Sequence, residues 1–74
     1  INANTFIGDN CIVNSKALIE HDCSILSHCH ISTNTSINGG VKIGSECFIG
    51  SNVITKDNIH IKDKSFIKAG TLVK

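Results

Sequence analysis

The sequence predicts an all-β solenoid, and three observations lead to that fold class. An aliphatic residue recurs every six positions from Ile1 to Val73, and only Thr55 departs from this column. A smaller or β-branched residue follows four positions later, and every cysteine falls in this second column. Asn, Asp and Gly, which favour turns, stand between the columns. Because a period of six fits neither a helix nor a simple alternating strand, the repeating unit is a short strand followed by a turn.

Turn formers fill two further positions of the six-residue unit. These residue types tolerate positive φ at a sharp corner, so both positions are predicted to lie in turns. The first set directly follows the aliphatic column, and the second set lies two positions further on. The first set is Asn2, Gly8, Asn14, Asn38, Gly44 and Gly50, and the second is Asn4, Asn10, Asp22, Asn34, Gly40, Asn52, Asn58 and Gly70.

The four cysteines are expected to be free thiols. Cys11, Cys23, Cys29 and Cys47 are separated by multiples of six, and no CxxC pair occurs. This spacing is typical of packing rather than of a zinc ribbon or a thioredoxin-like site. We therefore expect small, buried, apolar side chains in a reducing compartment, and hence a cytoplasmic protein.

Length and charge limit the classes of function. A single compact domain of 74 residues is normally only marginally stable without disulfides, a metal or oligomerisation. A net charge of +1 argues against binding to nucleic acid or to a membrane surface, and no apolar run is long enough to span a membrane. Because the chain begins at Ile1 rather than Met and shows no signal peptide, residues 1–74 are expected to be a piece of a longer soluble protein.

The pattern resembles the hexapeptide repeat of the left-handed parallel β-helix, in which three six-residue units make one triangular coil. The resemblance implies four coils of 18 residues, which span residues 1–18, 19–36, 37–54 and 55–72. Residues 18 apart then stack on one of three faces. The outward positions are Phe6, Ser24, Lys42 and His60 on the first face, Ile12, His30, Phe48 and Phe66 on the second, and Leu18, Ser36, Ile54 and Leu72 on the third.

The second and third faces are apolar ladders that a single chain would expose to water. Contiguous exposed apolar patches usually mark interfaces. We therefore predict a homotrimer in which the second face of one chain packs against the third face of the next. Small residues fit a three-fold axis at the corner between these faces, namely Ser32, Thr33, Gly50, Ser51, Ala69 and Gly70.

His21 is the leading candidate for chemistry. It falls at the expected corner between the third and first faces, where its stacking neighbours Ala3 and Gly39 leave room for another molecule. The adjacent Asp22 is suited to orient the imidazole, as a general base requires. His30 lies within the ladder of the second face, so a trimer would bring it near His21 of another chain. A solvated turn histidine and a ladder-filling histidine are the alternative interpretations of the two.

Four segments carry a more specific resemblance: Ile19-Glu20-His21-Asp22-Cys23, His30-Ile31-Ser32, Gly39-Gly40-Val41-Lys42-Ile43-Gly44 and Cys47-Phe48-Ile49-Gly50. They are similar to a bacterial sugar acetyltransferase family that includes the UDP-bacillosamine-pathway N-acetyltransferase and the sialic-acid O-acetyltransferases, enzymes of cell-surface polysaccharide biosynthesis. The resemblance implies transfer of an acetyl group from acetyl-CoA to the amino group of a nucleotide-linked amino sugar, by direct attack and without a metal.

The resemblance also implies roles for individual residues. His21 would be the base, and Asp22 would raise its basicity. An N–H at Gly39 would lie near the developing oxyanion. The acetyl-CoA contacts would come from His30, Gly39, Ser51 and Asn58.

Other interpretations stay open at this point. Members of the family carry an N-terminal Rossmann-like domain for the nucleotide sugar, and nothing in residues 1–74 corresponds to it, so this chain is expected to be the β-helix part. The acceptor atom could be oxygen, as in the sialic-acid enzymes. A zinc enzyme like the trimeric γ-type carbonic anhydrases would use His21, His28 and His30 as ligands. A solenoid that only trimerises a neighbouring domain would have no activity.

Overall fold

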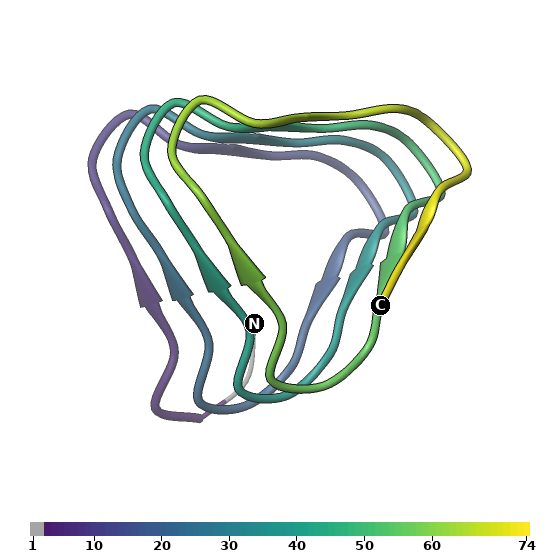
Figure 1. Ribbon diagram of the computed structural model, residues 1–74. Helices are drawn as coiled ribbons and strands as arrows, with labels where there is room; N and C mark the ends of the chain where they lie inside the picture. The colour runs from purple at the N-terminus through teal and green to yellow at the C-terminus, as the bar shows by residue number, and fades with distance from the viewer. Residues whose placement is uncertain (1–2) are drawn as a thin grey trace.

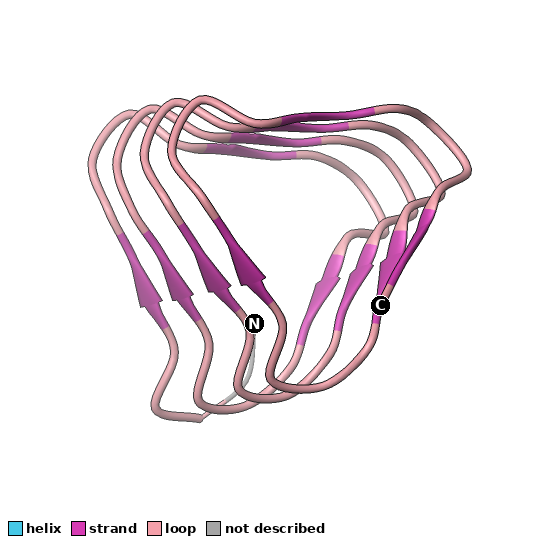
Figure 2. Cartoon of the chain, in the orientation of Figure 1, coloured by secondary structure: helices cyan, strands magenta, loops and turns pink. Residues whose placement is uncertain are grey.

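The computed structural model describes residues 3–74, so the expectations for Ile1 and Asn2 lie outside the described residues. The chain winds into stacked triangular coils, with short strands on three sides and loops at the corners (Figure 1). Figure 2 shows strands and loops but no helix in this part of the chain. The strands are β1 (Phe6–Ile7), β2 (Ile12–Val13), β3 (Leu18–Ile19), β4 (Ser24–Ile25), β5 (His30–Ile31), β6 (Ser36–Ile37), β7 (Lys42–Ile43), β8 (Phe48–Ile49), β9 (Ile54–Thr55), β10 (His60–Ile61), β11 (Phe66–Ile67) and β12 (Leu72–Val73).

Three parallel four-stranded sheets form the sides of the triangle. The first sheet has the order β1-β4-β7-β10, the second β2-β5-β8-β11 and the third β3-β6-β9-β12. Pairing joins residues 18 apart, such as Phe6 with Ser24 and His30 with Phe48. In Figure 1 the chain runs clockwise as it advances toward the viewer, which is the sense of a left-handed coil. The predicted fold class, coil length and three faces are therefore confirmed.

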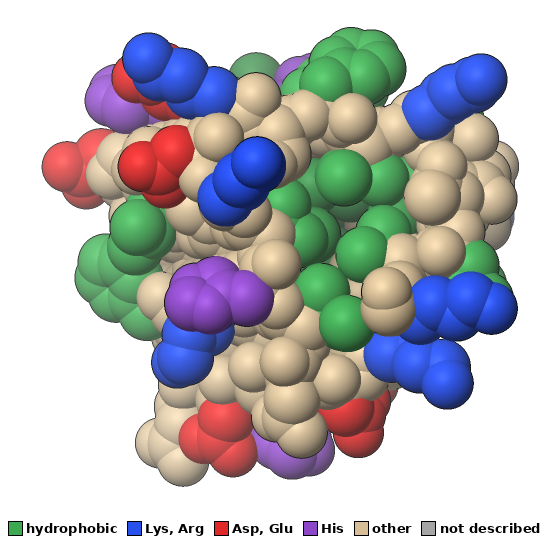
Figure 3. Space-filling model, viewed as in Figure 1, with side chains coloured by type: hydrophobic (Ala, Val, Ile, Leu, Met, Phe, Trp, Pro, Cys, Tyr) green, Lys and Arg blue, Asp and Glu red, His purple; other side chains and the backbone are tan. Residues whose placement is uncertain are grey.

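The aliphatic column fills the interior of the triangle. Each two-residue strand turns its first side chain outward and its second inward, because neighbouring side chains of a strand point to opposite faces. Figure 3 shows the inward apolar side chains gathered at the centre of the coil. Full burial of one such side chain contributes roughly 1.5–3 kcal/mol. The isoleucines of the aliphatic column that are at most 1% exposed are Ile19, Ile25, Ile31, Ile37, Ile43 and Ile49.

Positive φ occurs at only one of the two positions predicted for it. The fourth residue of every described unit lies in the left-handed region, including Lys16, His28, Glu46 and Lys64. The prediction for the first set of turn formers was wrong, because none of its described members has positive φ. Glycine occurs in that set for a different reason, which is the close approach of the next coil. A Cβ on Gly50 would lie 2.5 Å from the backbone nitrogen of Ala69 in the next coil.

The cysteines are free, as expected, although Cys11 is only half-buried. The residues of this column were expected only to pack, but several of them also donate hydrogen bonds to backbone carbonyls. The Cys29 thiol donates to the Gly44 carbonyl at 3.0 Å, and the Thr35 hydroxyl donates to the Gly50 carbonyl at 2.9 Å. Burial raises the pKa of the Cys29 thiol, which favours the protonated form that donates this bond.

Three corners connect the sheets, and each stacks four two-residue turns. The His21 corner joins the third sheet to the first and contains residues 3–4, 21–22, 39–40 and 57–58. The Ser27 corner joins the first sheet to the second and contains residues 9–10, 27–28, 45–46 and 63–64. The Ser51 corner joins the second sheet to the third and contains residues 15–16, 33–34, 51–52 and 69–70.

Candidate functional site at the His21 corner

His21 and Asp22 form a hydrogen-bonded pair on the outside of the His21 corner. The distance between His21 Nδ1 and Asp22 Oδ2 is 3.0 Å, and the two side chains are 62% and 58% exposed. An exposed pair of this kind adds at most about 1 kcal/mol to stability. Its main effect is therefore on orientation, because the carboxylate accepts the Nδ1 proton and leaves Nε2 as the basic nitrogen.

Gly39 lies directly against the His21 ring. A Cβ on Gly39 would lie 2.9 Å from Cε1 and 3.0 Å from Nε2 of the imidazole, so any larger residue would push the ring away. Gly39 itself is buried, and its N–H has no hydrogen-bond partner within residues 3–74. The small residue at position 39, expected from the stacking, thus leaves room for the His21 ring. The Nε2 of that ring is the nitrogen that the bond to Asp22 leaves available.

Asn58 belongs to the same corner, one coil beyond Gly39. Its N–H donates to the Gly39 carbonyl at 2.9 Å, and its side chain packs against Gly40. The coil therefore brings four of the expected site residues together: His21, Asp22, Gly39 and Asn58.

His30 and Ser51 lie elsewhere on the same chain. His30 is on β5 in the second sheet, which is the side of the triangle opposite the His21 corner (Figure 1). Asn14 Nδ2 donates to His30 Nε2 at 3.1 Å, and the His30 ring lies 5.1 Å from the ring of Phe48. Ser51 is half-buried at the Ser51 corner. Asn14 is a partner of His30 that the sequence did not single out.

No metal site forms within the described part of one chain. Residues 3–74 contain no group of three His, Cys, Asp or Glu side chains that could hold an ion. His28, one of the three ligands in the zinc interpretation, lies at the Ser27 corner with its Nδ1 3.5 Å from Asn10 Nδ2. His21, His28 and His30 thus occupy two corners and one sheet of the same chain.

The pairing of β6 with β9 contains an irregularity next to Gly39. Elsewhere from Gly8 to Lys56, the residue after each strand donates its N–H to the carbonyl of the strand residue in the next coil. At Asn38 the N–H instead donates to Thr55 Oγ1 at 3.0 Å, while Asn38 Nδ2 donates to the Thr55 carbonyl at 2.6 Å. The departure of Thr55 from the aliphatic column signals this irregularity in the sequence, but its partner Asn38 was expected only to form a turn.

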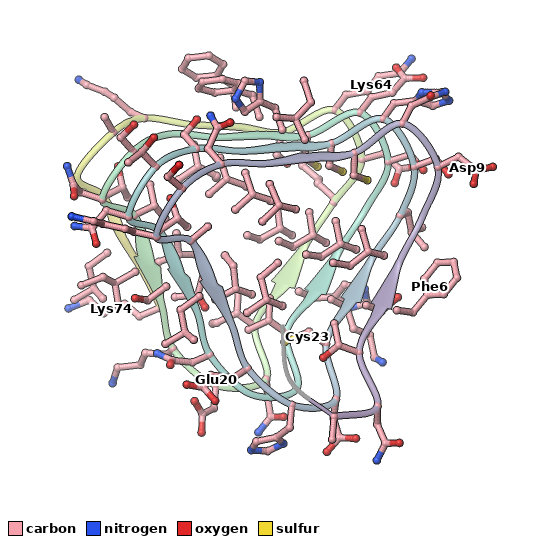
Figure 4. The ribbon with its side chains drawn as sticks, turned by 180° about the vertical axis from the view of Figure 1, so that it is seen from behind. Phe6, Asp9, Glu20, Cys23, Lys64 and Lys74 are labelled. Carbon is pink, nitrogen blue, oxygen red and sulfur yellow. The ribbon has the colours of Figure 1, made fainter. Side chains whose placement is uncertain are left out.

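Apolar side chains remain exposed on the second and third sheets. Phe66 is 72% exposed and stacks on Phe48 at 5.0 Å, and Ile54 on the third sheet is 48% exposed. The His21 corner itself is convex, and one chain has no pocket within residues 3–74. Figure 4 shows Glu20, the neighbour of His21, directed away from the coil. A substrate groove at this corner therefore needs a second surface.

The repeat can now be compared with known protein families. A family model described as bacterial transferase hexapeptide, with six repeats, matches residues 22–57, just under half of the chain. The hexapeptide segment begins at Asp22, directly after His21, and includes His30, Gly39 and Ser51. No curated protein and no solved structure gives a match.

This comparison agrees with the coil seen in the structure. It supports a function of the acyltransferase type, or a solenoid of the same construction, and it says nothing of a particular sugar. Among residues 3–74 there is no helix long and apolar enough to cross a membrane.

Proposed function

We propose that this chain is the acyl-transferring β-helix of an acetyl-CoA-dependent acetyltransferase whose acceptor is the amino group of a nucleotide-linked amino sugar. The observation that carries the proposal is the oriented His21–Asp22 pair lying over Gly39 in a hexapeptide-repeat coil. A histidine that only occupies a turn requires neither a carboxylate bound to Nδ1 nor a glycine beneath its ring, and His21 has both.

His21 acts as the general base in this proposal. The carboxylate of Asp22 holds the Nδ1 proton, so Nε2 takes the proton from the acceptor amine as the nitrogen attacks the thioester carbonyl. The new C–N bond first gives a tetrahedral oxyanion. As this oxyanion collapses, the C–S bond breaks, and the proton held on Nε2 goes to the departing thiolate. Attack is direct, because the nearby Cys23 is 2% exposed and donates its thiol to the Asn38 carbonyl at 3.1 Å.

Gly39 supports the same step through its backbone. Its N–H has no partner among the described residues and lies in the residue that contacts the His21 ring, which suits it to donate to a developing oxyanion. Acetyl-CoA supplies the activated acetyl group as a co-substrate. Asn58 shares the corner and is the second residue there proposed to contact acetyl-CoA.

A homotrimer completes the site in this proposal. The exposed ladders on the second and third sheets need a covering surface, and a second copy offers the complementary ladder. When the second sheet of one chain covers the third sheet of the next, His30 approaches the His21 corner from the neighbouring copy. Ser51 lies at the corner on the three-fold axis, at the other end of the third sheet from His21, so its proposed contact with acetyl-CoA rests on the family resemblance and not on this packing. Burial of the His21–Asp22 pair in that groove strengthens its electrostatic interaction, since the effective dielectric constant falls.

The proposed location is the cytoplasm. All four cysteines are free thiols, and three of them are buried. Free thiols in a small β domain fit a reducing compartment, where acetyl-CoA and nucleotide sugars are also made.

An acetyl-transfer assay tests the proposed function. The protein is incubated with acetyl-CoA and a panel of UDP-linked amino sugars, and CoA and the acetylated sugar are quantified by chromatography and mass spectrometry. We expect stoichiometric formation of an N-acetylated sugar and of CoA, unchanged after treatment with a zinc chelator.

Each of the other outcomes points to a specific alternative. Acetylation of a sialic acid hydroxyl instead of an amine would move the function to the O-acetyltransferases. Stoichiometric zinc, lost on His30→Ala, would indicate a metal enzyme. A trimer with no binding of acetyl-CoA by calorimetry would overturn the proposal in favour of a solenoid that only assembles.

A further inference from the structure

The one departure from the aliphatic column coincides with the one departure from the regular hydrogen-bond ladder. Thr55 is fully buried and stands where the described part of the column otherwise has Ile or Val. The pairing of β6 with β9 joins only Ser36 to Ile54, whereas every other strand pairing joins two residue pairs. The side chains of Asn38 and Thr55 therefore replace a main-chain hydrogen bond at this single place among residues 3–74.

The replacement fixes the residue that immediately precedes Gly39. Asn38 is held by three interactions: its N–H on Thr55 Oγ1, its Nδ2 on the Thr55 carbonyl, and its own carbonyl, which accepts the Cys23 thiol at 3.1 Å. Asn38 is thus hydrogen-bonded both to Cys23 in the preceding coil and to Thr55 in the following coil. The backbone of Gly39 follows without an intervening residue.

The contact between Gly39 and His21 leaves little tolerance. A Cβ on Gly39 would lie 2.9 Å from the ring, so the imidazole lies directly over the glycine and only a residue without a side chain fits beneath it. The attachment of Asn38 to Thr55 thus acts on the Gly39 backbone together with two main-chain bonds, from Gly40 N–H to the His21 carbonyl and from Asn58 N–H to the Gly39 carbonyl.

We propose that Thr55 and Asn38 are positioning residues that hold the Gly39 backbone at the height which places the His21 ring for proton transfer. This inference rests on the proposed function for its catalytic meaning, but not for its structural content. Neither residue touches substrate. The hydroxyl of Thr55 opens the ladder by accepting the N–H, and the amide of Asn38 satisfies the carbonyl that the opening would otherwise leave without a donor.

Thr35 is the natural comparison within the chain. It is also a fully buried threonine, and its hydroxyl makes one hydrogen bond, to the Gly50 carbonyl beside the Ser51 corner. Removal of either hydroxyl leaves an unmatched buried polar group, so the costs in stability should be similar. Only the loss at Thr55 should reach the His21 corner.

The experiment compares Thr55→Val, Thr55→Ser and Thr35→Val in the full chain labelled with carbon-13 in its histidine rings. Each of the four histidines gives one Cε1–Hε1 NMR signal, and the His21 signal is assigned by its absence from His21→Ala. We expect Thr55→Val to move the His21 signal and leave those of His28 and His60 in place. Thr55→Ser, which keeps the acceptor oxygen, should restore the wild-type position, and Thr35→Val should leave the His21 signal unmoved.

A second variant and a kinetic measurement complete the test. Asn38→Ala removes the Nδ2 donor at a half-buried position and should move the same His21 signal even if Thr55→Val does not fold. In the acetyl-transfer assay, Thr55→Val should lower kcat about tenfold, with a smaller change in KM for acetyl-CoA, because misplacement of a base acts mainly on the chemical step.

Two results would overturn the inference. One is a His21 signal that stays at its wild-type position in both Thr55→Val and Asn38→Ala. The other is a shift of the same size in Thr35→Val, which would make the effect a general loss of stability. Absence of acetyl transfer in the wild type would instead count against the proposed function, and the NMR comparison would still decide whether Thr55 positions His21.

Discussion

The His21 corner and the Ser27 corner share one backbone conformation but differ in how their amide groups are satisfied. At the Ser27 corner, Asp9 N–H donates to Ser27 Oγ at 3.1 Å and Ser45 N–H donates to Asp63 Oδ1 at 2.8 Å. At the His21 corner, the equivalent N–H of Gly39 has no partner among residues 3–74. Side chains of the Ser27 corner thus satisfy two of its amides, those of Asp9 and Ser45, and no side chain of the described residues does the same for the Gly39 amide.

The histidines of the two corners also differ in the partners of their side chains. His28 takes positive φ, and its ring reaches only a neighbouring amide, Asn10 Nδ2, at 3.5 Å. His21 has a carboxylate at 3.0 Å and a glycine beneath its ring. The comparison shows that a corner histidine is informative through its neighbours and its place in the turn, since His28 takes the second, positive-φ position and His21 the first.

The largest expected effect separates these two histidines. His21→Ala should lower kcat for acetyl transfer at least about a hundredfold, because the general base is lost. His28→Asn, in which Asn tolerates the positive φ of that position, should stay within about twofold of the wild type. Steady-state kinetics on both variants, with the assembly checked by light scattering, measures the difference. A fully active His21→Ala protein would remove the proposed mechanism.

A methyl group added at Gly39 should have the next largest effect. In Gly39→Ala the new Cβ would displace the His21 ring, and we expect kcat to fall about tenfold. Ser45→Ala is the matched control, because Ser45 holds the equivalent position at the Ser27 corner and should leave kcat unchanged. Equal losses in the two variants would mean that the fit of Gly39 to His21 has no special role.

For kcat, the negative charge of Asp22 should matter less than the presence of an oxygen that accepts the hydrogen bond from His21 Nδ1. Asp22→Asn keeps a residue suited to positive φ and keeps an acceptor for Nδ1, so only the ionic part of the interaction is lost. We expect a severalfold fall in kcat, in line with a charge-assisted bond being about twice as strong as a neutral one. Asn10→Asp, the reverse exchange beside His28, is the control and should not change kcat.

The smallest effect concerns stability at high pH. Burial raises the pKa of the Cys29 thiol above its ordinary value of 9.0. As pH rises through 9.0, the unfolded chain therefore loses this proton while the folded chain keeps it, and the free energy of unfolding falls. Chemical denaturation at pH 7 and pH 10 should show a smaller alkaline loss for Cys29→Val than for wild type. Cys11→Val should show the full loss.

The repeat made the fold and the faces predictable, because one residue type per position decides which side chain is buried. The same stacking placed Gly39 beside His21, whereas Asn58 was singled out only by the family resemblance and lies on the same corner in the structure. The link between Asn38 and Thr55 was out of reach, because a single threonine in the column is equally compatible with simple packing. That the Gly39 N–H has no partner among residues 3–74 also depends on geometry that no residue type specifies.

The central claim is that the His21 corner becomes an active site only against a neighbouring chain that supplies His30. Mixed trimers of His21→Ala and His30→Ala test it most directly, after the two inactive variants are unfolded together and refolded in equal amounts. Random mixing should restore about a quarter of the wild-type activity, because some interfaces then contain both intact residues. Mixed trimers that stay as inactive as the separate variants would show that the two histidines do not share a site between chains.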